Sequence, residues 1–374
     1  MSKEPRYPIT LIFLGSFFIL ITLMLSGCAG SAITASSWPG LAVDETTIYA
    51  SYGTAVFGID IDNGRELWRF PREQDRNLTF YAPPALTDVD LIIVGGYDNR
   101  VYALDRITGA QVNAWPQPFD EAEDRIIGAP VIAGDIVLVP SADGRLYALR
   151  WEDGEPAWRR PYQAGEDPGP LWSAPLVDGE QIYISSLDHH VYAIDLNSGV
   201  EIWRTADLGA SIVDTPTLAD GILLVGTFGE ELVALEGATG EIVWTFETEG
   251  WVWSNPAISQ GVAYLGDTEG MAYAVDVADG TELWRKTIDG AIAATPAIGQ
   301  GVVYFVTEES IVHAADAETG GSIWTSDAKL QGKLLSDPIL LTDQLIVGAA
   351  WPDCFIYSVD IENGRSGCMV SLSE

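Results

Sequence analysis

A short pattern that recurs eight times is the feature that most constrains the fold of this chain. A small residue is followed two positions later by an acid, four positions after that by a glycine, and after four more by a tryptophan, as in residues 193–203 (AIDLNSGVEIW). The glycines are Gly64, Gly109, Gly154, Gly199, Gly240, Gly280, Gly320 and Gly364. Their spacing of 40 to 45 residues indicates a repeated supersecondary unit.

Three copies depart from the pattern. Arg150 takes the position of the acid in the third copy, Trp115 comes two residues late in the second, and Cys368 replaces the tryptophan of the eighth. A proline precedes each glycine by 24 to 26 residues, and β-branched runs such as residues 181–185 alternate with turn residues between them. Each unit therefore predicts four short β-strands joined by tight turns.

The eight units span residues 38–374 and leave no linker for a second domain. A single four-stranded sheet cannot bury its two apolar faces alone, so the sheets must pack on one another. A radial ring achieves this and leaves only short edges exposed. The sequence therefore predicts an all-β fold, a single eight-bladed β-propeller of four-stranded antiparallel blades. We expect each acid to bind its turn and each glycine to take a backbone angle that costs other residues more.

The N-terminus resembles a bacterial lipoprotein signal peptide. Lys3 and Arg6 precede the apolar residues 9–25, and the sequence Leu-Ser-Gly-Cys ends at Cys28. We expect residues 1–27 to be removed, a lipid to be attached to Cys28, and residues 28–37 to tether the propeller to the membrane. The alternative is an uncleaved membrane helix, for which seventeen residues are a marginal length. The prediction is an extracytoplasmic protein anchored in the cell envelope, at the outer membrane facing the periplasm if the cell has two membranes.

The chain is strongly acidic, with 54 Asp and Glu against 19 Lys and Arg and a formal net charge of −35. Such a surface repels phosphate backbones, so we expect no nucleic-acid partner. The sequence contains no Cys-x-x-Cys-His haem motif, phosphate-binding Gly-x-x-x-x-Gly-Lys loop or Gly-x-Ser-x-Gly motif. Most acids occupy turn positions of the repeat and form no isolated catalytic pair. We therefore predict no catalytic residues and no cofactor.

The histidines and cysteines give few candidate sites. His189 and His190 are adjacent in a predicted hairpin turn, which favours a solvated turn over a metal site, and His313 occupies a position that other units fill with Tyr or Val. We expect no bound metal. Cys354 and Cys368 fall on neighbouring strands of the last unit, but they look offset by about one residue pair. A disulfide and two buried thiols both remain open for this pair.

The repeated pattern resembles the tryptophan-docking motif of the quinoprotein (PQQ-type) β-propellers, which implies that each indole lies against the neighbouring blade. In its export signal, anchor, blade count and length, the chain resembles the BamB-type lipoproteins of the outer-membrane β-barrel assembly machinery. This resemblance implies a non-enzymatic scaffold for protein–protein interaction in outer-membrane protein assembly, with a protein partner in the cell envelope. A PQQ-dependent dehydrogenase and a carbohydrate- or small-ligand-binding propeller remain alternatives. Many such dehydrogenases have adjacent cysteines, which are absent here.

One face of the propeller is predicted to carry the binding loops. The links between blades and the turns between second and third strands emerge on the same face, and the early links, such as residues 160–174, are long. Trp251 lies in the link before Pro256, where other units have Arg125 or Lys333, so we expect it to be exposed. It is a candidate partner contact, with local packing as the alternative. Trp253 is predicted to be a core residue, and residues 31–37 could join the last blade as a latch.

Overall fold

The computed structural model describes residues 39–112, 115, 119–166, 168–327, 330–350 and 353–371. Residues 37–374 form one compact unit. The predictions for the signal peptide at 1–27, the tether at 28–37, Cys28 and the latch at 31–37 lie outside the described residues. In the described part of the chain, no helix is long and apolar enough to cross a membrane.

In the part of the chain that the structure describes, thirty-one strands form eight antiparallel sheets, which we call blades 1 to 8 in chain order. Blades 1 to 4 contain β1 (Gly40–Val43), β2 (Thr47–Tyr52), β3 (Ala55–Asp60) and β4 (Glu66–Phe70); β5 (Ala85–Leu86), β6 (Leu91–Gly95) and β7 (Val101–Asp105); β8 (Val131–Ala133), β9 (Ile136–Pro140), β10 (Arg145–Arg150) and β11 (Tyr162–Gln163); and β12 (Leu176–Asp178), β13 (Gln181–Ser185), β14 (Val191–Asp195) and β15 (Glu201–Arg204). Blades 5 to 8 contain β16 (Thr217–Ala219), β17 (Ile222–Thr227), β18 (Glu231–Glu236) and β19 (Ile242–Glu247); β20 (Ala257–Ser259), β21 (Val262–Gly266), β22 (Met271–Asp276) and β23 (Glu282–Thr287); β24 (Ala297–Gly299), β25 (Val302–Val306), β26 (Val312–Asp316) and β27 (Ser322–Thr325); and β28 (Ile339–Leu340), β29 (Gln344–Gly348), β30 (Cys354–Asp360) and β31 (Ser366–Ser371).

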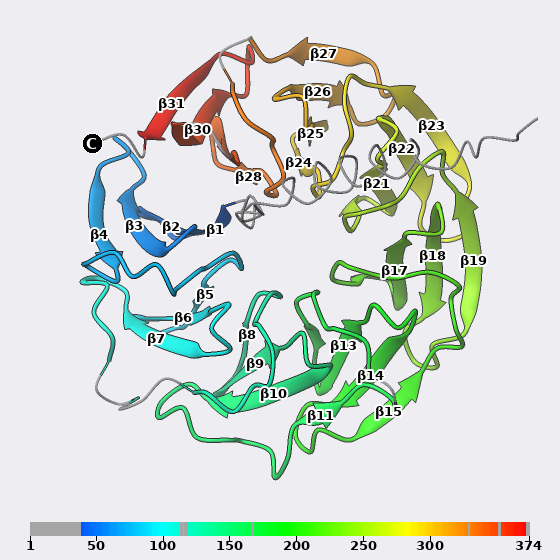
Figure 1. Cartoon of the computed structure of the whole chain (residues 1–374). Helices are drawn as coiled ribbons and strands as arrows, with labels where there is room; N and C mark the ends of the chain where they lie inside the picture. Colours follow the sequence, from blue (N-terminus) through cyan, green and yellow to red (C-terminus); the bar gives the residue numbers. More distant parts are fainter. Residues whose placement is uncertain are drawn as a thin grey trace, which may run out of the picture. The chain divides into compact units, whose positions relative to one another are not determined.

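The blades are arranged around a central axis, with the first strand of each blade innermost and the last on the outer rim (Figure 1). Neighbouring strands within a blade are consecutive in sequence, so every blade is an up-and-down sheet. The predicted eight-bladed, all-β propeller is therefore confirmed.

Blade 2 differs from the expected four strands, because its described residues form a three-stranded sheet. Isolated bridges join Leu104 to Gln111 and Val101 to Phe119, so eight residue steps of the outer segment lie opposite three steps of β7. A regular ladder cannot span this mismatch. The extra residues in the outer segment also explain why Trp115 comes two residues late in the sequence.

The hydrophobic core consists of eight clusters, each formed by two neighbouring blades. One cluster, for example, joins Tyr183 and Val191 of blade 4 to Leu223 and Val225 of blade 5. No blade therefore has a core of its own, which is why a single repeat cannot fold alone.

Each docking tryptophan bonds to the next blade. Its indole Nε1 donates to a backbone carbonyl just after β7, β10, β14, β18, β22, β26 or β30, at 2.8 to 3.2 Å. The donors are Trp68, Trp115, Trp158, Trp203, Trp244, Trp284 and Trp324. This arrangement confirms that the indoles lie against the neighbouring blade.

The repeated glycines are required for two reasons. They have φ between 66° and 76°, as the turn prediction expected. Seven of them also lie flat on the indole of the preceding blade, where an added Cβ would come within 2.3 to 2.8 Å of a ring atom. The acids bind the same turns, as when Asp316 Oδ1 accepts the backbone N–H of Thr319 at 2.9 Å. Acid, glycine and tryptophan therefore form one structural unit that spans two blades.

Within the described residues, no tryptophan docks at the closure between blade 8 and blade 1. Phe355 stacks on Tyr52 with ring centroids 4.8 Å apart, and the Ser336 hydroxyl donates to the carbonyl oxygen of Pro39. In this part of the chain, each of the two blades is built from its own segment, and side-chain contacts join them.

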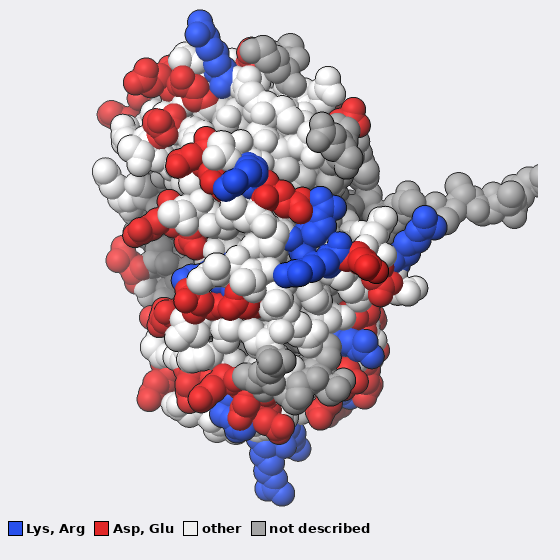
Figure 2. Space-filling view, turned by 90° about the vertical axis from the view of Figure 1, so that its left-hand side faces the viewer, with Lys and Arg blue, Asp and Glu red and all other residues white. Residues whose placement is uncertain are grey.

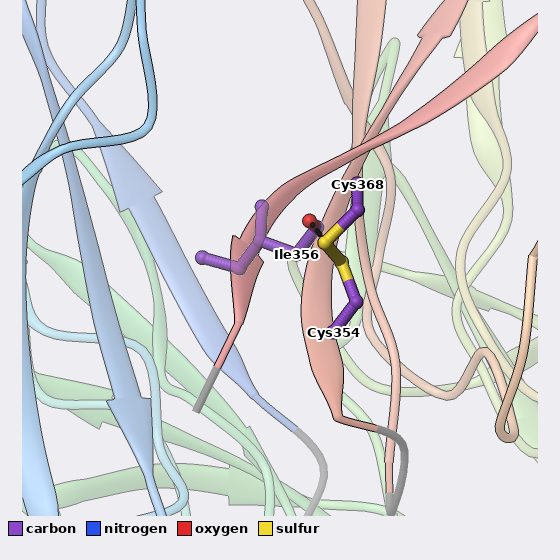
Figure 3. Close-up of a disulfide and its surroundings, with 3 residues drawn as sticks. All are labelled: Cys354, Ile356 and Cys368. Carbon is purple, nitrogen blue, oxygen red and sulfur yellow. Dashed lines mark hydrogen bonds between the residues drawn. A yellow bond between two sulfur atoms is a disulfide. The ribbon is translucent and has the colours of Figure 1, made fainter. Parts of the chain in front are cut away.

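In place of the eighth tryptophan, Cys368 on β31 forms a disulfide with Cys354 on β30 (Figure 3). Cys368 lies opposite Tyr357 in the ladder and Cys354 lies opposite Ser371, with two register shifts between these pairs. The cysteine Cα atoms are 5.9 Å apart. The disulfide joins the two outermost strands of blade 8.

Acidic side chains are spread over the side of the ring shown in Figure 2, with basic side chains gathered near its middle. Ion pairs such as Arg106 with Asp90 and Arg285 with Glu249, both at 3.0 Å, involve solvent-accessible groups. Surface pairs of this kind contribute little stability. The blades are therefore held together mainly by the apolar interfaces and the tryptophan contacts.

Candidate functional site: the central cavity

A cavity of about 940 Å³ lies at the inner ends of the blades. Its walls come from the links between blades and from the turns between second and third strands, which hydrogen-bond to each other. The backbone N–H of Leu208, in a link, donates to the His189 carbonyl at 3.0 Å, and that of Thr268, in a turn, donates to the Trp251 carbonyl at 3.1 Å. We call this surface the link face. The links and the turns between second and third strands lie on one face, as predicted from the sequence.

One position of the repeat lines the cavity in seven blades. It is the residue three places before the repeated proline. Its occupants are Tyr81, Ile127, Trp172, Val213, Trp253, Ala293 and Leu335. The prediction that Trp253 is a core residue is therefore wrong. Extended backbone alternates its side chains, so the preceding residue, Val252, enters the core with no exposed surface while Trp253 faces the cavity.

Trp251 is 48% exposed, and its ring and its backbone are each held by a contact. Its ring stacks on Phe228 with centroids 5.1 Å apart, and Trp253 contacts the same phenylalanine at 4.9 Å. The backbone N–H of Trp251 donates to Thr268 Oγ1 at 3.0 Å. The predicted exposure of Trp251 is confirmed, and its indole also packs locally. Contact with a partner stays a prediction.

A buried carboxylate fixes the link that carries Trp251. Asp267 Oδ2 accepts the N–H groups of Glu249 and Gly250 at 3.1 and 3.0 Å and the Tyr273 hydroxyl at 2.7 Å, while Oδ1 accepts the N–H of Met271 at 2.9 Å. Several donors to one carboxylate compensate the cost of burying it. The link therefore holds Trp251 and Trp253 against Phe228 in a fixed position. We call these three side chains the aromatic wall.

The charges that line the cavity are unevenly distributed. Among the described residues, five lining carboxylates come from blades 5 to 8 and their links, whereas the one basic lining residue, Arg125, lies in the link between blades 2 and 3. The acids are Asp214, Glu230, Glu269, Glu308 and Asp337. Glu308 is paired with Lys333, and Arg125 with Asp124 at 3.2 Å. The four other acids have no ion-pair partner within the described residues.

Two of these acids lie near the axis. Asp214 Oδ1 and Oδ2 accept the backbone N–H groups of Thr215 and Asn255 at 2.7 and 2.9 Å. Asp337 Oδ1 accepts the N–H of Thr295 at 2.7 Å. Asp337 is exposed to the cavity. Partial loss of hydration and then repulsion by Asp214 raise its pKa to about 7. Burial raises the pKa of Asp214 as well.

The histidines do not form a metal site. His189 Nδ1 lies 3.1 Å from Asp207 Oδ1, and His190 Nδ1 lies 3.0 Å from the Thr205 carbonyl oxygen, so both rings contact the link that follows β15. His313 is mostly buried, and loss of hydration lowers its pKa. Within the described ranges, no group of three or more His, Cys, Asp or Glu side chains is arranged to hold a metal ion.

Eight sheets docked by tryptophans around a central cavity place the chain in the class of PQQ-like β-propellers. The sequence profile described as "Outer membrane protein assembly factor BamB" matches residues 28–205, 187–286 and 268–366, and the chain belongs to this family.

Solved structures share the fold at low sequence identity. The crystal structure of BamB from Moraxella catarrhalis matches with a TM-score of 0.69 and 18% identity, over 83% of this chain and 92% of that one. The computationally designed Ika8 protein matches with a TM-score of 0.70 and 15% identity, over 86% of this chain and 96% of that one. No curated protein matches the sequence.

Proposed function

We propose that this protein is a lipid-anchored extracytoplasmic scaffold that has no catalytic activity of its own and binds a protein partner through its link face. The observation that carries the proposal is the fixed aromatic wall on that face, where Trp251 is exposed yet held by Phe228 and Thr268. Rigid, partly exposed aromatic side chains are favourable anchors in protein interfaces, because little conformational entropy is lost on binding.

The family match supports the type of partner. The matching profile is named for an outer-membrane protein assembly factor, so we propose a partner in the barrel-assembly machinery of the cell envelope. The lipobox ending at Cys28 supports anchoring in the same compartment. Several acyl chains on one residue suffice for stable membrane attachment.

Crosslinking in the native envelope tests the scaffold. A photoreactive phenylalanine derivative is placed at Trp251, and, as a matched control, at Glu318 in the exposed turn between β26 and β27 on the opposite face. We expect a specific protein adduct at position 251 and none at 318. Equal labelling at both positions, or none at 251, would contradict binding through the link face. Adducts that contain no barrel-assembly component would exclude the assembly role.

Two further measurements test the remaining parts of the proposal. Replacing Cys28 with Ala should prevent lipid attachment and release the protein from the membrane fraction, whereas Cys354→Ala should leave the anchor intact. Purified protein supplied with PQQ and calcium should reduce no redox dye. Quinone-dependent dye reduction would replace the scaffold with the dehydrogenase alternative.

A further inference from the structure

The central cavity has the size and lining of a ligand site. Its volume of about 940 Å³ falls in the upper part of the range for small-molecule pockets, roughly 300 to 1,000 Å³. The lining combines aromatic surface with carboxylates. Tyr81, Tyr97 and Trp172 line the part formed by blades 2 to 4 and their links, whereas the unpaired acids come from the part formed by blades 5 to 8.

Four of the acids that line the cavity have no basic partner among the described residues to neutralise their charge. Asp214 and Asp337 accept backbone N–H groups, but the described residues offer neither of them a basic partner. Glu230 and Glu269, on the turns above them, also lack an ion pair within that part of the chain. Carboxylates that face one cavity without a counter-charge repel one another, so a cation that enters the cavity gains electrostatic energy at several groups at once.

The aromatic side chains suit the same kind of ligand. The negative face of an indole or phenol ring attracts ammonium and guanidinium groups within about 6 Å of its centroid. The cavity already shows this chemistry once, since the guanidinium carbon of Arg125 lies 5.5 Å from the centroid of Tyr97. Trp253 and Trp251 offer further aromatic surface in the acidic part of the cavity. Both rings contact Phe228, two residues before Glu230, and the Trp251 N–H donates to Thr268, the residue before Glu269.

We infer that the central cavity binds a ligand bearing ammonium or guanidinium groups, with the carboxylates of blades 5 to 8 neutralising its charge and the aromatic side chains covering its alkyl segments. Such a group can belong to a free polyamine or to Lys and Arg side chains of a protein segment inserted from the link face. The chemistry at the cavity is the same for both sources. The inference holds whether or not the protein is lipid-anchored.

Titration of the purified full chain with cationic probes tests the inference. Spermidine and a short peptide of alternating lysine and alanine are compared with maltohexaose and with the corresponding glutamate–alanine peptide, at 150 mM salt to weaken contacts with the acidic outer surface. Calorimetry gives the stoichiometry, and tryptophan fluorescence reports on the cavity because Trp172, Trp251 and Trp253 line it. We expect one saturable site for a cationic probe and none for the neutral or acidic ones.

A pair of matched variants separates the cavity from the general surface charge. Glu230→Gln with Glu269→Gln removes two charges from the cavity, and Glu241→Gln with Glu318→Gln removes two from exposed turns of the opposite face. The first pair should weaken binding about tenfold and the second less than twofold, because the ligand contacts the cavity charges directly whereas salt screens the distant charges of the opposite face. Equal weakening by both pairs would show a surface-charge effect and overturn the inference.

The remaining outcomes identify the source or reject the site. Tighter binding of spermidine than of the lysine peptide indicates a free polyamine, and the reverse order indicates a protein segment. Absence of saturable binding for both cationic probes, or preferential binding of maltohexaose, overturns the inference. Neither result would remove a specific crosslink at Trp251, so the scaffold proposal is tested separately.

Discussion

Gly320 lies against the indole of Trp284 in the preceding blade, so that a Cβ at Gly320 would fall 2.8 Å from two ring atoms. The same indole donates to the Ala317 carbonyl at 2.9 Å, three residues before the glycine. One turn therefore supplies both the flat surface on which the tryptophan lies and the acceptor for its nitrogen. The contact repeats at seven of the eight blade interfaces.

Replacing Gly320 with Ala should destabilise the protein by about 2 to 4 kcal/mol, because a left-handed backbone strain of about 1 kcal/mol adds to an overpacking cost of about 1 to 3 kcal/mol. Gly301→Ala is the matched control, since Gly301 also has a positive φ (78°) but has no atom within 4 Å of an added Cβ. Chemical denaturation of both variants isolates the steric cost. Equal losses of stability would show that the indole moves aside freely.

Trp284 can be tested through its ring and its nitrogen separately. Trp284→Ala should cost about 3 to 5 kcal/mol of unfolding free energy through lost apolar contact, and Trp284→Phe about 1 to 3 kcal/mol, since the carbonyl of Ala317 loses its donor. Leu283→Ala, at the neighbouring and 50% exposed position of β23, should change stability by less than about 0.5 kcal/mol. A large effect at Leu283 with a small one at Trp284 would contradict the assigned faces of β23.

Blade 8 depends on its disulfide instead of a tryptophan. The link between Cys354 and Cys368 closes a loop with a sequence separation of 14, for which a stabilisation of about 3 kcal/mol is expected. A reducing agent should therefore lower the melting temperature of the native chain and leave that of the Cys354→Ala, Cys368→Ala double variant unchanged. Mass spectrometry of the unreduced protein should find no free thiol at either position. Two free thiols would contradict the bond.

The repeat residues were predictable from the sequence because their roles are local. Asp316 and Gly320 shape a four-residue turn, and a tryptophan at a constant distance from it must meet the same environment in every blade. Eight such copies specify a closed ring. In the sequence, only the late position of Trp115 indicated that blade 2 is irregular. The fourth strand of this blade is not paired as a regular ladder because eight residue steps separate the bridged residues Gln111 and Phe119.

The cavity was not predictable in detail, because it is made by residues that are distant in sequence. Trp253 was predicted to enter the core, which its neighbour Val252 enters instead. Six residues at the equivalent position of other repeats also line the cavity, so the ring structure identifies this position as a lining position. Asp214 and Asp337 occur at different positions before their prolines, in blades that are not neighbours. Only ring closure brings their charges close enough to interact. A pattern search of single repeats cannot find such a pair.

That pair gives the chain a specific dependence on pH. Asp337 binds its proton more tightly in the folded chain, where its pKa is about 7, than in the unfolded chain, where it is 3.8. Between these values the native state holds more protons, so this carboxyl lowers stability as pH rises from about 4 to about 7. Asp337→Asn keeps an acceptor for the Thr295 N–H but carries no charge. The variant should exceed the native chain in stability by about 0.5 to 2 kcal/mol at pH 8, because solvent screens the repulsion at an exposed carboxyl, and by less at pH 5.

Asp207 is the appropriate control for this measurement. It lies on the exposed link face, and the Gly209 N–H at 2.8 Å lowers its pKa, so its contribution to stability is present at neutral pH and is lost as pH falls. Asp207→Asn should therefore bring no gain at pH 8. Denaturant titrations of the native chain and both variants at pH 5 and pH 8 give the comparison. A gain for Asp337→Asn that is the same at both pH values would mean that local side-chain contacts, rather than repulsion between Asp214 and Asp337, set its stability.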